Sequence, residues 1–223
     1  GTRFRCNTEI GVTLTELRHV RRSLASWMAP RSVGSAAVLS PSSGWVQAQP
    51  LGTVLIIAPW NYPLNLAATD ALAALIDGNA VVIKPASITP FCALAAADMF
   101  YRAGLPRELF QVVPGSGGTV GGAIVDNVDY LMFTGSTATG KKIVEASADN
   151  LTRLTLELGG NDAGIVLDDA DPKEISGDLF WGAFINTGQT CAAMKRVYVP
   201  ESLYDAVCEA LIEVAKASPM GVG

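Results

Sequence analysis

The sequence predicts an α/β protein with a doubly wound parallel sheet, followed by the start of a further α/β unit. Continuous apolar runs of strand length are typical of strands buried on both faces of a parallel sheet. These runs alternate with longer segments of helical spacing, as in consecutive βαβ units. Proline at a helix's first turn and glycine just past its end, as at Pro63 and Gly78, mark the helix limits. Ligands of such folds bind at the carboxyl ends of the strands.

Composition narrows the class of protein. With 223 residues, 49% of them hydrophobic, the chain is large enough to bury a sizeable core. It has 16 Lys and Arg against 21 Asp and Glu, a formal net charge of −5, and neither sign gathers in a long block. We therefore expect no nucleic-acid partner. The longest apolar runs, such as 54–59, are too short to cross a bilayer, so no membrane span is expected.

The four cysteines are widely spaced and His19 is the only histidine, so neither a disulfide framework nor a metal site is indicated. A reducing, cytoplasmic compartment fits this usage. Cys6, Cys92 and Cys208 match no motif and are interpreted as structural. The chain begins without methionine and ends in a loop that follows a helix, so we expect a fragment truncated at both ends.

The chain opens with a segment that precedes the regular series. Apolar residues recur at helical spacing over 13–28, which predicts an amphipathic helix that Pro30 ends. His19 on this helix is interpreted as a surface or interface residue, because no catalytic partner is its neighbour. Residues 36–49 then predict two short strands around the turn-rich cluster 41–44. We expect this hairpin to protrude from the main body.

The regular series begins at residue 53. The expected strands cover 53–58, 80–83, 110–113, 130–133 and 154–157, with helices between them, and belong to a first domain at 1–159. A strand at 164–167, a helix ending at 186, a strand at 196–199 and a helix at 203–217 begin a second domain at 160–223. The acidic tract 168–171 is interpreted as a helix start rather than a metal site, because carboxylates are favoured at helix N-termini.

Two glycine-containing turns follow predicted strands and open helices. Residues 115–122 allow backbone N–H groups to approach a phosphate, although Val120 breaks the strict GxGxxG pattern and a flexible turn explains the stretch equally well. Residues 133–142 nearly match a Walker A loop, but Lys142 replaces the Ser or Thr that binds magnesium. An NTPase is therefore disfavoured, and we interpret Ser136, near a helix N-terminus, as a ligand of a cofactor phosphate.

Lys84 and Ser87 follow a strand that is expected near the middle of the sheet. A lysine there can hydrogen-bond ribose hydroxyls, although a solvated loop lysine is the ordinary alternative. In dinucleotide sites an acidic residue binds the adenosine 2′-hydroxyl and repels a 2′-phosphate. Ser87 brings no such charge, which favours tolerance of NADP as well as NAD.

Two further stretches carry chemically reactive groups. Residues 186–193 place Cys191 on a glycine-containing bend, where a reactive thiol can be presented. Taken alone, a free cysteine is more often a small buried hydrophobe. Residues 154–160 end an apolar strand at Glu157, just before two glycines. The hypothesis is that the thiol and the carboxylate converge at one site.

Five short motifs follow one another along the chain: Ala58-Pro59-Trp60-Asn61-Tyr62-Pro63, Lys84-Pro85-Ala86-Ser87, Phe133-Thr134-Gly135-Ser136-Thr137, Leu156-Glu157-Leu158-Gly159-Gly160 and Gly188-Gln189-Thr190-Cys191. In this order they resemble the motifs of the NAD(P)-dependent aldehyde dehydrogenase superfamily. The opening residues that are most similar to its class 3, fatty-aldehyde-like branch are Glu16, His19, Trp27, Met28 and Pro30. The resemblance covers essentially the whole chain and implies a Rossmann-like cofactor domain. Family members run further, through the rest of the catalytic domain.

The resemblance implies an oxidoreductase that converts an aldehyde into a carboxylic acid with NAD or NADP. Cys191 is then the nucleophile, Asn61 and the Cys191 backbone N–H hold the oxyanion, and Glu157 is the general base. The implied cofactor-binding residues are Pro59, Trp60, Lys84, Ser87, Gly117, Gly121, Phe133, Gly135, Ser136 and Leu158. The complete protein is expected to be a homo-oligomer.

Two alternatives remain open. In the first, the chain is a catalytically inactive nucleotide-binding or oligomerising fragment, with the 36–49 hairpin as its interaction element. In the second, it belongs to a CoA-acylating aldehyde dehydrogenase, in which CoA rather than water takes the acyl group. Glu157 argues against the second alternative, because that chemistry needs no hydrolytic base.

Overall fold

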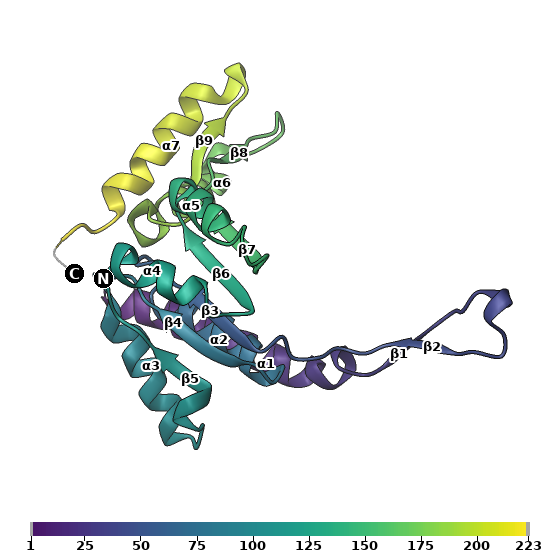
Figure 1. Ribbon diagram of the computed structural model, residues 1–223. Helices are drawn as coiled ribbons and strands as arrows, with labels where there is room; N and C mark the ends of the chain where they lie inside the picture. Colours follow the sequence, from purple (N-terminus) through teal and green to yellow (C-terminus); the bar gives the residue numbers. More distant parts are fainter. Residues whose placement is uncertain (1, 222–223) are drawn as a thin grey trace. The chain divides into compact units, whose positions relative to one another are not determined.

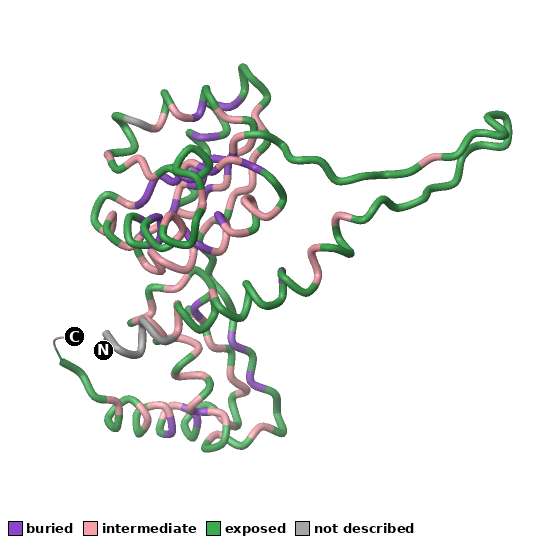
Figure 2. Tube along the Cα trace, turned by 90° about the horizontal axis from the view of Figure 1, so that it is seen from below, coloured by how far each residue is buried: buried purple, intermediate pink, exposed green. Residues whose placement is uncertain are grey.

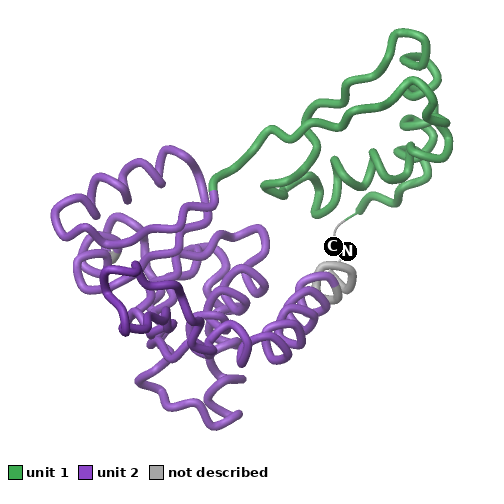
Figure 3. The backbone as a smooth tube through the Cα atoms, turned by 90° about the vertical axis from the view of Figure 1, so that its right-hand side faces the viewer, with its two compact units in different colours: residues 1–5, 158–223 green, residues 6–157 purple. Residues whose placement is uncertain are grey.

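The computed structural model describes residues 2–221, with side chains for residues 8–119 and 121–221. The Cys6 side chain therefore lies outside the described residues. The chain forms two compact units (Figure 3). The first unit contains residues 6–157, and the second contains residues 158–223 together with residues 1–5.

A five-stranded sheet forms the centre of the first unit (Figure 1). Its strands are β3 (Thr53–Ile57), β4 (Ala80–Lys84), β5 (Phe110–Val112), β6 (Tyr130–Gly135) and β7 (Arg153–Leu158). They are arranged in the order β5-β4-β3-β6-β7. Strand β3 pairs in parallel with both β4 and β6, and β4 pairs in parallel with β5. Each strand lies within two residues of its expected limits.

Both faces of this sheet are covered, as a doubly wound fold requires. Val54, Leu55 and Ile56 follow one another along β3, and each is at most 3% exposed. Because neighbouring strand residues point to opposite faces, this continuous burial means that both faces are packed. The helices that connect the strands are α2 (Asn65–Ile76), α3 (Pro90–Arg102), α4 (Gly117–Val125) and α5 (Thr137–Ala146). The α/β fold with a doubly wound sheet is confirmed.

Small and aromatic side chains bring α2 and α3 close to the sheet. Ala67 and Ala71 of α2 have no exposed surface, so the helix backbone packs directly on the strands. Phe110 at the start of β5 is also fully buried, and its ring centroid lies 4.9 Å from that of Phe100 on α3. Burying a side chain of this size contributes on the order of 1.5–3 kcal/mol. These contacts hold α2 and α3 against the sheet.

The strand order reverses next to β3. From β3 the chain continues to β4 and β5 on one side, and then places β6 and β7 on the other side. The carboxyl ends of β3 and β6 therefore flank a topological switch point, where ligands of open α/β sheets bind. The register sets Ile57 of β3 opposite both Lys84 of β4 and Phe133 of β6. These residues mark the level at which the loops leave the sheet.

Helix α1 (Thr2–Trp27) precedes the sheet and is longer than the sequence indicated. It begins at Thr2 rather than at residue 13, because its first turns lack the apolar spacing on which the prediction depended. It ends before Pro30, as expected. Of the expected apolar face, Val20 is 5% exposed, whereas Leu14 is 43% exposed.

A hairpin stands off the sheet of the first unit (Figure 1). Its strands β1 (Arg31–Val33) and β2 (Gly44–Val46) pair in antiparallel fashion, and every residue of 31–49 except Gly44 is exposed (Figure 2). The expectation of a strand just after residue 36 was wrong, because residues 37–39 form a 3-10 turn. Pro41 follows and has no N–H with which to continue a strand ladder. The hairpin is present but begins at residue 31.

The second unit has its own small parallel sheet, formed by β8 (Asp162–Ile165) and β9 (Met194–Tyr198). Helices α6 (Pro172–Phe184) and α7 (Tyr204–Ala217) pack against each other. Short 3-10 turns occur in this unit at η3 (Ile185–Gly188) and η4 (Glu201–Leu203), and in the first unit at η2 (Arg107–Leu109).

The acidic tract of the second unit begins a helix, as the sequence indicated. Asp171 caps α6, and its Oδ1 atom accepts a hydrogen bond from the Lys173 N–H at 2.8 Å. Strand β8 lies slightly earlier than expected, at residues 162–165 instead of 164–167. In the described part of the chain, no helix combines the length and the apolar character that crossing a bilayer requires.

Candidate functional site

A pocket with a volume of about 640 Å³ lies at the switch point of the first unit. Ile57 and Phe133, which are opposite each other on β3 and β6, line it together with Lys84 from the end of β4. Pro59 and Trp60, in the loop that follows β3, also line it. The pocket is therefore at the carboxyl ends of three neighbouring strands, the edge at which ligands of this fold class bind.

One wall of the pocket is a face of α4 that is formed by four glycines and Val125. Gly117, Gly118, Gly121 and Gly122 all line the pocket. A Cβ atom added at any of these positions would meet no atom within 4 Å, so the space beside them is open. Side chains here would occupy this space. The glycine face leaves room for a ligand to lie directly against the helix backbone.

The N-terminus of α5 forms another part of the pocket lining. Ser136 caps this helix, and its Oγ atom accepts a hydrogen bond from the Thr139 N–H at 3.3 Å. Ser136, Thr139 and Lys142 line the pocket. The start of a helix presents unpaired N–H groups and the positive end of the helix dipole, which together bind anions such as phosphate.

The ring of Phe133 leaves no room for a side chain at Gly135, the residue just before this cap. A Cβ atom at Gly135 would lie 2.5 Å from the ring of Phe133, which is 5% exposed. Any side chain at this position would displace the ring that lines the pocket. Phe133, Gly135 and Ser136, which the sequence proposed as cofactor ligands, thus lie together on one wall.

Lys84 is a buried cation at the base of the pocket. It is 7% exposed, and its Nζ atom donates a hydrogen bond to the Pro85 carbonyl oxygen at 3.0 Å. Burial lowers the pKa of Lys84 below its ordinary value, because the charged form loses hydration. Among the described residues that line the pocket, Lys84 and Lys142 are the charged ones, and both are cationic. The pocket therefore fits an anionic ligand.

Two of the proposed cofactor-binding residues, Ser87 and Leu158, are absent from the described lining of this pocket. Ser87 is not among the described residues that line the pocket, and its hydroxyl donates a hydrogen bond to the Gly115 carbonyl oxygen at 3.1 Å. This bond joins the loop after β4 to the loop after β5. Leu158 is half-buried at the end of β7 and belongs to the second unit.

Asn61 and Glu157 also follow or end strands of the sheet. Asn61 is half-buried in the loop between β3 and α2, next to the pocket residue Trp60. Glu157 is exposed near the end of β7. Burial, and secondarily the negative charge of Glu157, raise the pKa of Asp70 on α2 from 3.8 to about 6. Asp70 is therefore close enough to Glu157 for their charges to interact.

Cys191 is an exposed, free cysteine in the second unit. It lies in a turn between η3 and β9, as the sequence predicted for a bend that contains glycine. Asn186, Thr187 and Gly188 upstream have φ values of 53°, 60° and 75°. The left-handed region is unusual for a β-branched residue such as Thr187, so this backbone is strained.

Polar contacts brace the turn that follows. The Lys195 ammonium donates hydrogen bonds to the carbonyl oxygens of Thr190 and Ala193 at 3.2 Å, and it lies 3.5 Å from that of Cys191. Gly160 also lies close to this turn: a Cβ atom there would lie 3.4 Å from the Cys191 carbonyl oxygen. The glycine after β7 thus lets the chain pass close to the cysteine turn.

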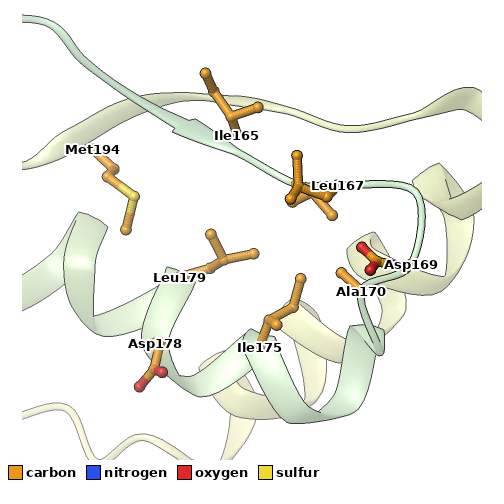
Figure 4. A pocket seen from close by; sticks show the side chains of 9 residues that line it. Ile165, Leu167, Asp169, Ala170, Ile175, Asp178, Leu179 and Met194 are labelled. Atoms are coloured by element: carbon orange, nitrogen blue, oxygen red, sulfur yellow. The ribbon is translucent and has the colours of Figure 1, made fainter.

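The second unit has a further pocket of about 320 Å³ between β8 and α6 (Figure 4). Ile165 and Leu167 on one side and Ile175 and Leu179 on the other make it largely apolar. None of the residues that the sequence proposed for catalysis or cofactor binding lines it. We therefore place the candidate cofactor site in the first unit.

Sequence reasoning missed several pocket residues. Thr139 and Lys142 are the polar ones, and Ile143 and Ala146 are the apolar ones. A usable signal was present, because these positions follow Ser136 at helical spacing and therefore share one face of α5. No sequence pattern indicated that the pKa of Asp70 would be raised.

The switch-point sheet, the glycine wall and the capped helix N-terminus define a nucleotide-binding α/β protein. Residues 5–223 match the model of the aldehyde dehydrogenase family. A relative named "Putative succinate-semialdehyde dehydrogenase (NADP(+)) 2" from Mycobacterium ulcerans is 41% identical over 221 residues, which are 98% of this chain and 42% of that protein. A relative named "Aldehyde dehydrogenase, mitochondrial" from Leishmania tarentolae is 42% identical over 81% of this chain and 37% of its own length.

Solved structures are also similar to this chain, both in fold and in sequence. An NADP-dependent enzyme of E. coli has a TM-score of 0.90 and 35% identity, covering 95% of this chain and 44% of that chain. The NAD⁺ complex of an aldehyde dehydrogenase from Bacillus cereus has a TM-score of 0.88 and 36% identity, covering 96% of this chain and 43% of that chain.

The chain belongs to the aldehyde dehydrogenase family. It spans about two fifths of the length of the relatives that it matches, 42% in the Mycobacterium ulcerans protein. The family predicted from the motifs is confirmed, whereas its class 3, fatty-aldehyde-like branch stays a prediction.

Proposed function

We propose that this chain supplies the cofactor-binding part and the reactive cysteine of an enzyme that oxidises an aldehyde to a carboxylic acid with NAD or NADP. The observation that carries the proposal is the switch-point pocket, which combines an open glycine wall, a capped helix N-terminus and two lysines. Family membership supports the same activity. When bound, the cofactor supplies the acceptor for the hydride that leaves the substrate.

Different residues are proposed to hold different parts of the cofactor. Ser136 and Gly135 meet the pyrophosphate at the start of α5, and Gly117 and Gly121 face the adenosine. Lys84 hydrogen-bonds ribose hydroxyls. The remaining proposed cofactor contacts are Pro59, Trp60, Phe133, Ser87 and Leu158.

Cys191 is the proposed nucleophile. Its thiolate adds to the aldehyde carbonyl carbon, and the Asn61 amide and the Cys191 backbone N–H donate hydrogen bonds to the oxyanion that forms. Collapse of this thiohemiacetal expels hydride and leaves a thioester on the sulfur. Glu157 then takes a proton from the water that hydrolyses the thioester, which releases the acid and restores the cysteine.

Ser87, which follows the pocket residue Ala86 in the sequence, brings no carboxylate that would repel a 2′-phosphate, and this supports use of NADP as well as NAD. Relatives with NADP(+) in their names agree with this choice. The names of these relatives also make succinate semialdehyde the first aldehyde to test.

Several broader proposals accompany this function. Residues 1–159 are the cofactor-binding domain, and residues 160–223 are the first part of the catalytic domain. The exposed hairpin supports assembly into a homo-oligomer, because its apolar side chains Val38 and Trp45 are 89% and 65% exposed. The spacing of the cysteines supports a cytoplasmic location.

The experiment is aldehyde-dependent reduction of NADP and of NAD by the purified chain, with succinate semialdehyde as substrate and cofactor binding measured in parallel. Cys191→Ala is the test variant. Cys208→Ala is the matched control, since Cys208 is a half-buried cysteine of α7. We expect turnover to fall at least about 10⁴-fold in Cys191→Ala and to persist in Cys208→Ala.

Equal turnover by Cys191→Ala and the wild type contradicts the assignment of the nucleophile. Failure of the wild-type chain to bind either cofactor contradicts the proposal as a whole. Cofactor binding without turnover keeps the pocket assignment and favours the inactive-fragment alternative.

A further inference from the structure

Glu9 connects two segments that are far apart in the sequence. It lies on α1, and its Oε2 atom accepts hydrogen bonds from the backbone N–H groups of Leu64 and Asn65, both at 2.9 Å. One turn further along α1, the Thr13 hydroxyl oxygen accepts a hydrogen bond from the Asn65 side-chain amide at 3.1 Å. Helix α1 therefore meets the start of α2 through polar contacts (Figure 1).

These contacts supply a cap that α2 lacks locally. The first N–H groups of a helix have no partner within the helix. Leu64, the residue before α2, provides no side-chain hydrogen bond to them. The Glu9 carboxylate accepts hydrogen bonds from two of these N–H groups. It also places negative charge at the positive end of the helix dipole. The start of α2 is thus fixed by α1.

Asn61 lies in the loop 58–64 that precedes this cap. At the sheet end of the loop, the Ala58 N–H donates a hydrogen bond to the Lys84 carbonyl oxygen at 3.1 Å. At the helix end, Glu9 holds the chain. The loop that carries Asn61 is therefore anchored at both ends, and its second anchor comes from a distant part of the sequence.

We infer that Glu9 is a positioning residue for Asn61, which it holds in place by capping α2. This inference rests on the proposed function, in which the Asn61 amide stabilises the oxyanion. A displacement of about 1 Å in a group that acts on the reacting atoms can lower the rate 10²-fold. Because the oxyanion forms only after the thiolate adds, loss of the cap lowers kcat more than it weakens binding.

The test compares Glu9→Ala and Glu9→Gln with the control Glu16→Gln. Gln keeps an acceptor oxygen at the same reach without the charge, whereas Ala removes the acceptor. Glu16 is exposed on the same helix. We expect kcat to fall about 10-fold to 100-fold in Glu9→Ala, less in Glu9→Gln, and not at all in Glu16→Gln. KM for the aldehyde and Kd for NADP change less than about twofold in all three variants.

The position of Asn61 is also measured without turnover, by nitrogen–proton correlation NMR. The side-chain amide signals of Asn61 are expected to shift in Glu9→Ala and to keep their wild-type positions in Glu16→Gln. If the wild-type chain does not oxidise aldehydes, the proposed function fails, while these signals still decide whether Glu9 positions Asn61.

Unchanged Asn61 signals in Glu9→Ala overturn the inference. A loss of NADP affinity as large as the loss of kcat, in both Glu9→Ala and Glu9→Gln, also overturns it, because Glu9 then only stabilises the fold. Shifted Asn61 signals together with retained NADP affinity support the inference.

Discussion

The switch-point pocket and the turn that carries Cys191 are held by different means. The pocket is lined by strand ends in register and by a helix that its own Ser136 caps. The Cys191 turn follows three left-handed residues and is braced by Lys195. Regular elements form a binding surface before any ligand arrives, whereas a strained turn depends on a few polar contacts. Substitutions in the two regions should therefore separate cofactor affinity from chemistry.

Apart from the loss of the nucleophile, the largest expected effect comes from removing the proposed base. Glu157→Gln keeps the size of the side chain but cannot take a proton from water. We expect acid formation to fall about 10²-fold to 10⁴-fold, while the affinity for NADP stays unchanged. The acyl group then accumulates on Cys191, and intact-protein mass spectrometry detects it.

Glu145→Gln is the matched control, because Glu145 is an exposed glutamate of α5 that does not line the pocket. Undiminished acid formation by Glu157→Gln would show that another group is the base. Release of the acyl group only after CoA is added to the wild type would favour the CoA-acylating alternative.

A smaller effect is expected at the pocket itself. Lys84→Met should weaken NADP binding about 10-fold, because a hydrogen bond from a charged donor is lost. Burial lowers the pKa of Lys84, so the wild-type affinity should fall as the pH rises through that lowered value and the ammonium loses its proton. This pH dependence should be absent in Lys84→Met. Titration calorimetry at several pH values measures both effects.

Lys141→Met is the control for this substitution, since Lys141 is an exposed lysine of α5 outside the pocket. Equal NADP affinity in Lys84→Met and the wild type would remove Lys84 from the site.

The smallest effect concerns stability rather than function. Asp70 has a pKa of about 6 in the folded chain, against an ordinary value of 3.8. The folded state binds the Asp70 proton more tightly than the unfolded state does. The free energy of unfolding therefore falls as the pH rises from about 4 to 6, and the full loss of stability is present above that range. Asp70→Asn should therefore stabilise the chain by about 1–2 kcal/mol at pH 7.

This gain should vanish at about pH 2.5, where Asp70 is protonated in both the folded and the unfolded states. Thermal unfolding of the wild type and Asp70→Asn at the two pH values measures it. A gain of equal size at both pH values would show that ionisation of Asp70 is not its cause.

The two regions also differ in how far the sequence predicted them. The strands of the sheet were predictable because burial on both faces requires continuous apolar runs, as in β3. Gly117 and Gly121 were predictable as pocket residues from the family resemblance, because the glycine-rich stretch alone fitted a flexible turn equally well. Lys142 was considered only as a departure from a Walker A loop, yet the turn of α5 brings it to the pocket.

Contacts between distant segments were not predictable. Glu9 meets Leu64, which is 55 residues away, and no local pattern signals that contact. Asp70 interacts with Glu157 only because α2 packs on the sheet. The first hairpin strand was misplaced because the apolar residues after Ala36 form a 3-10 turn of only three residues, which is too short to show a periodic pattern.

The central claim is that the switch-point pocket binds the dinucleotide against the glycine wall of α4. Titration of the wild type, Gly121→Val and Gly177→Val with NADP tests it most directly. A Cβ atom would meet no atom within 4 Å at either glycine, but only Gly121 lines the pocket, since Gly177 is on α6. The account predicts that affinity falls about 100-fold, or 2.7 kcal/mol, in Gly121→Val and is unchanged in Gly177→Val. Wild-type affinity in Gly121→Val would contradict it.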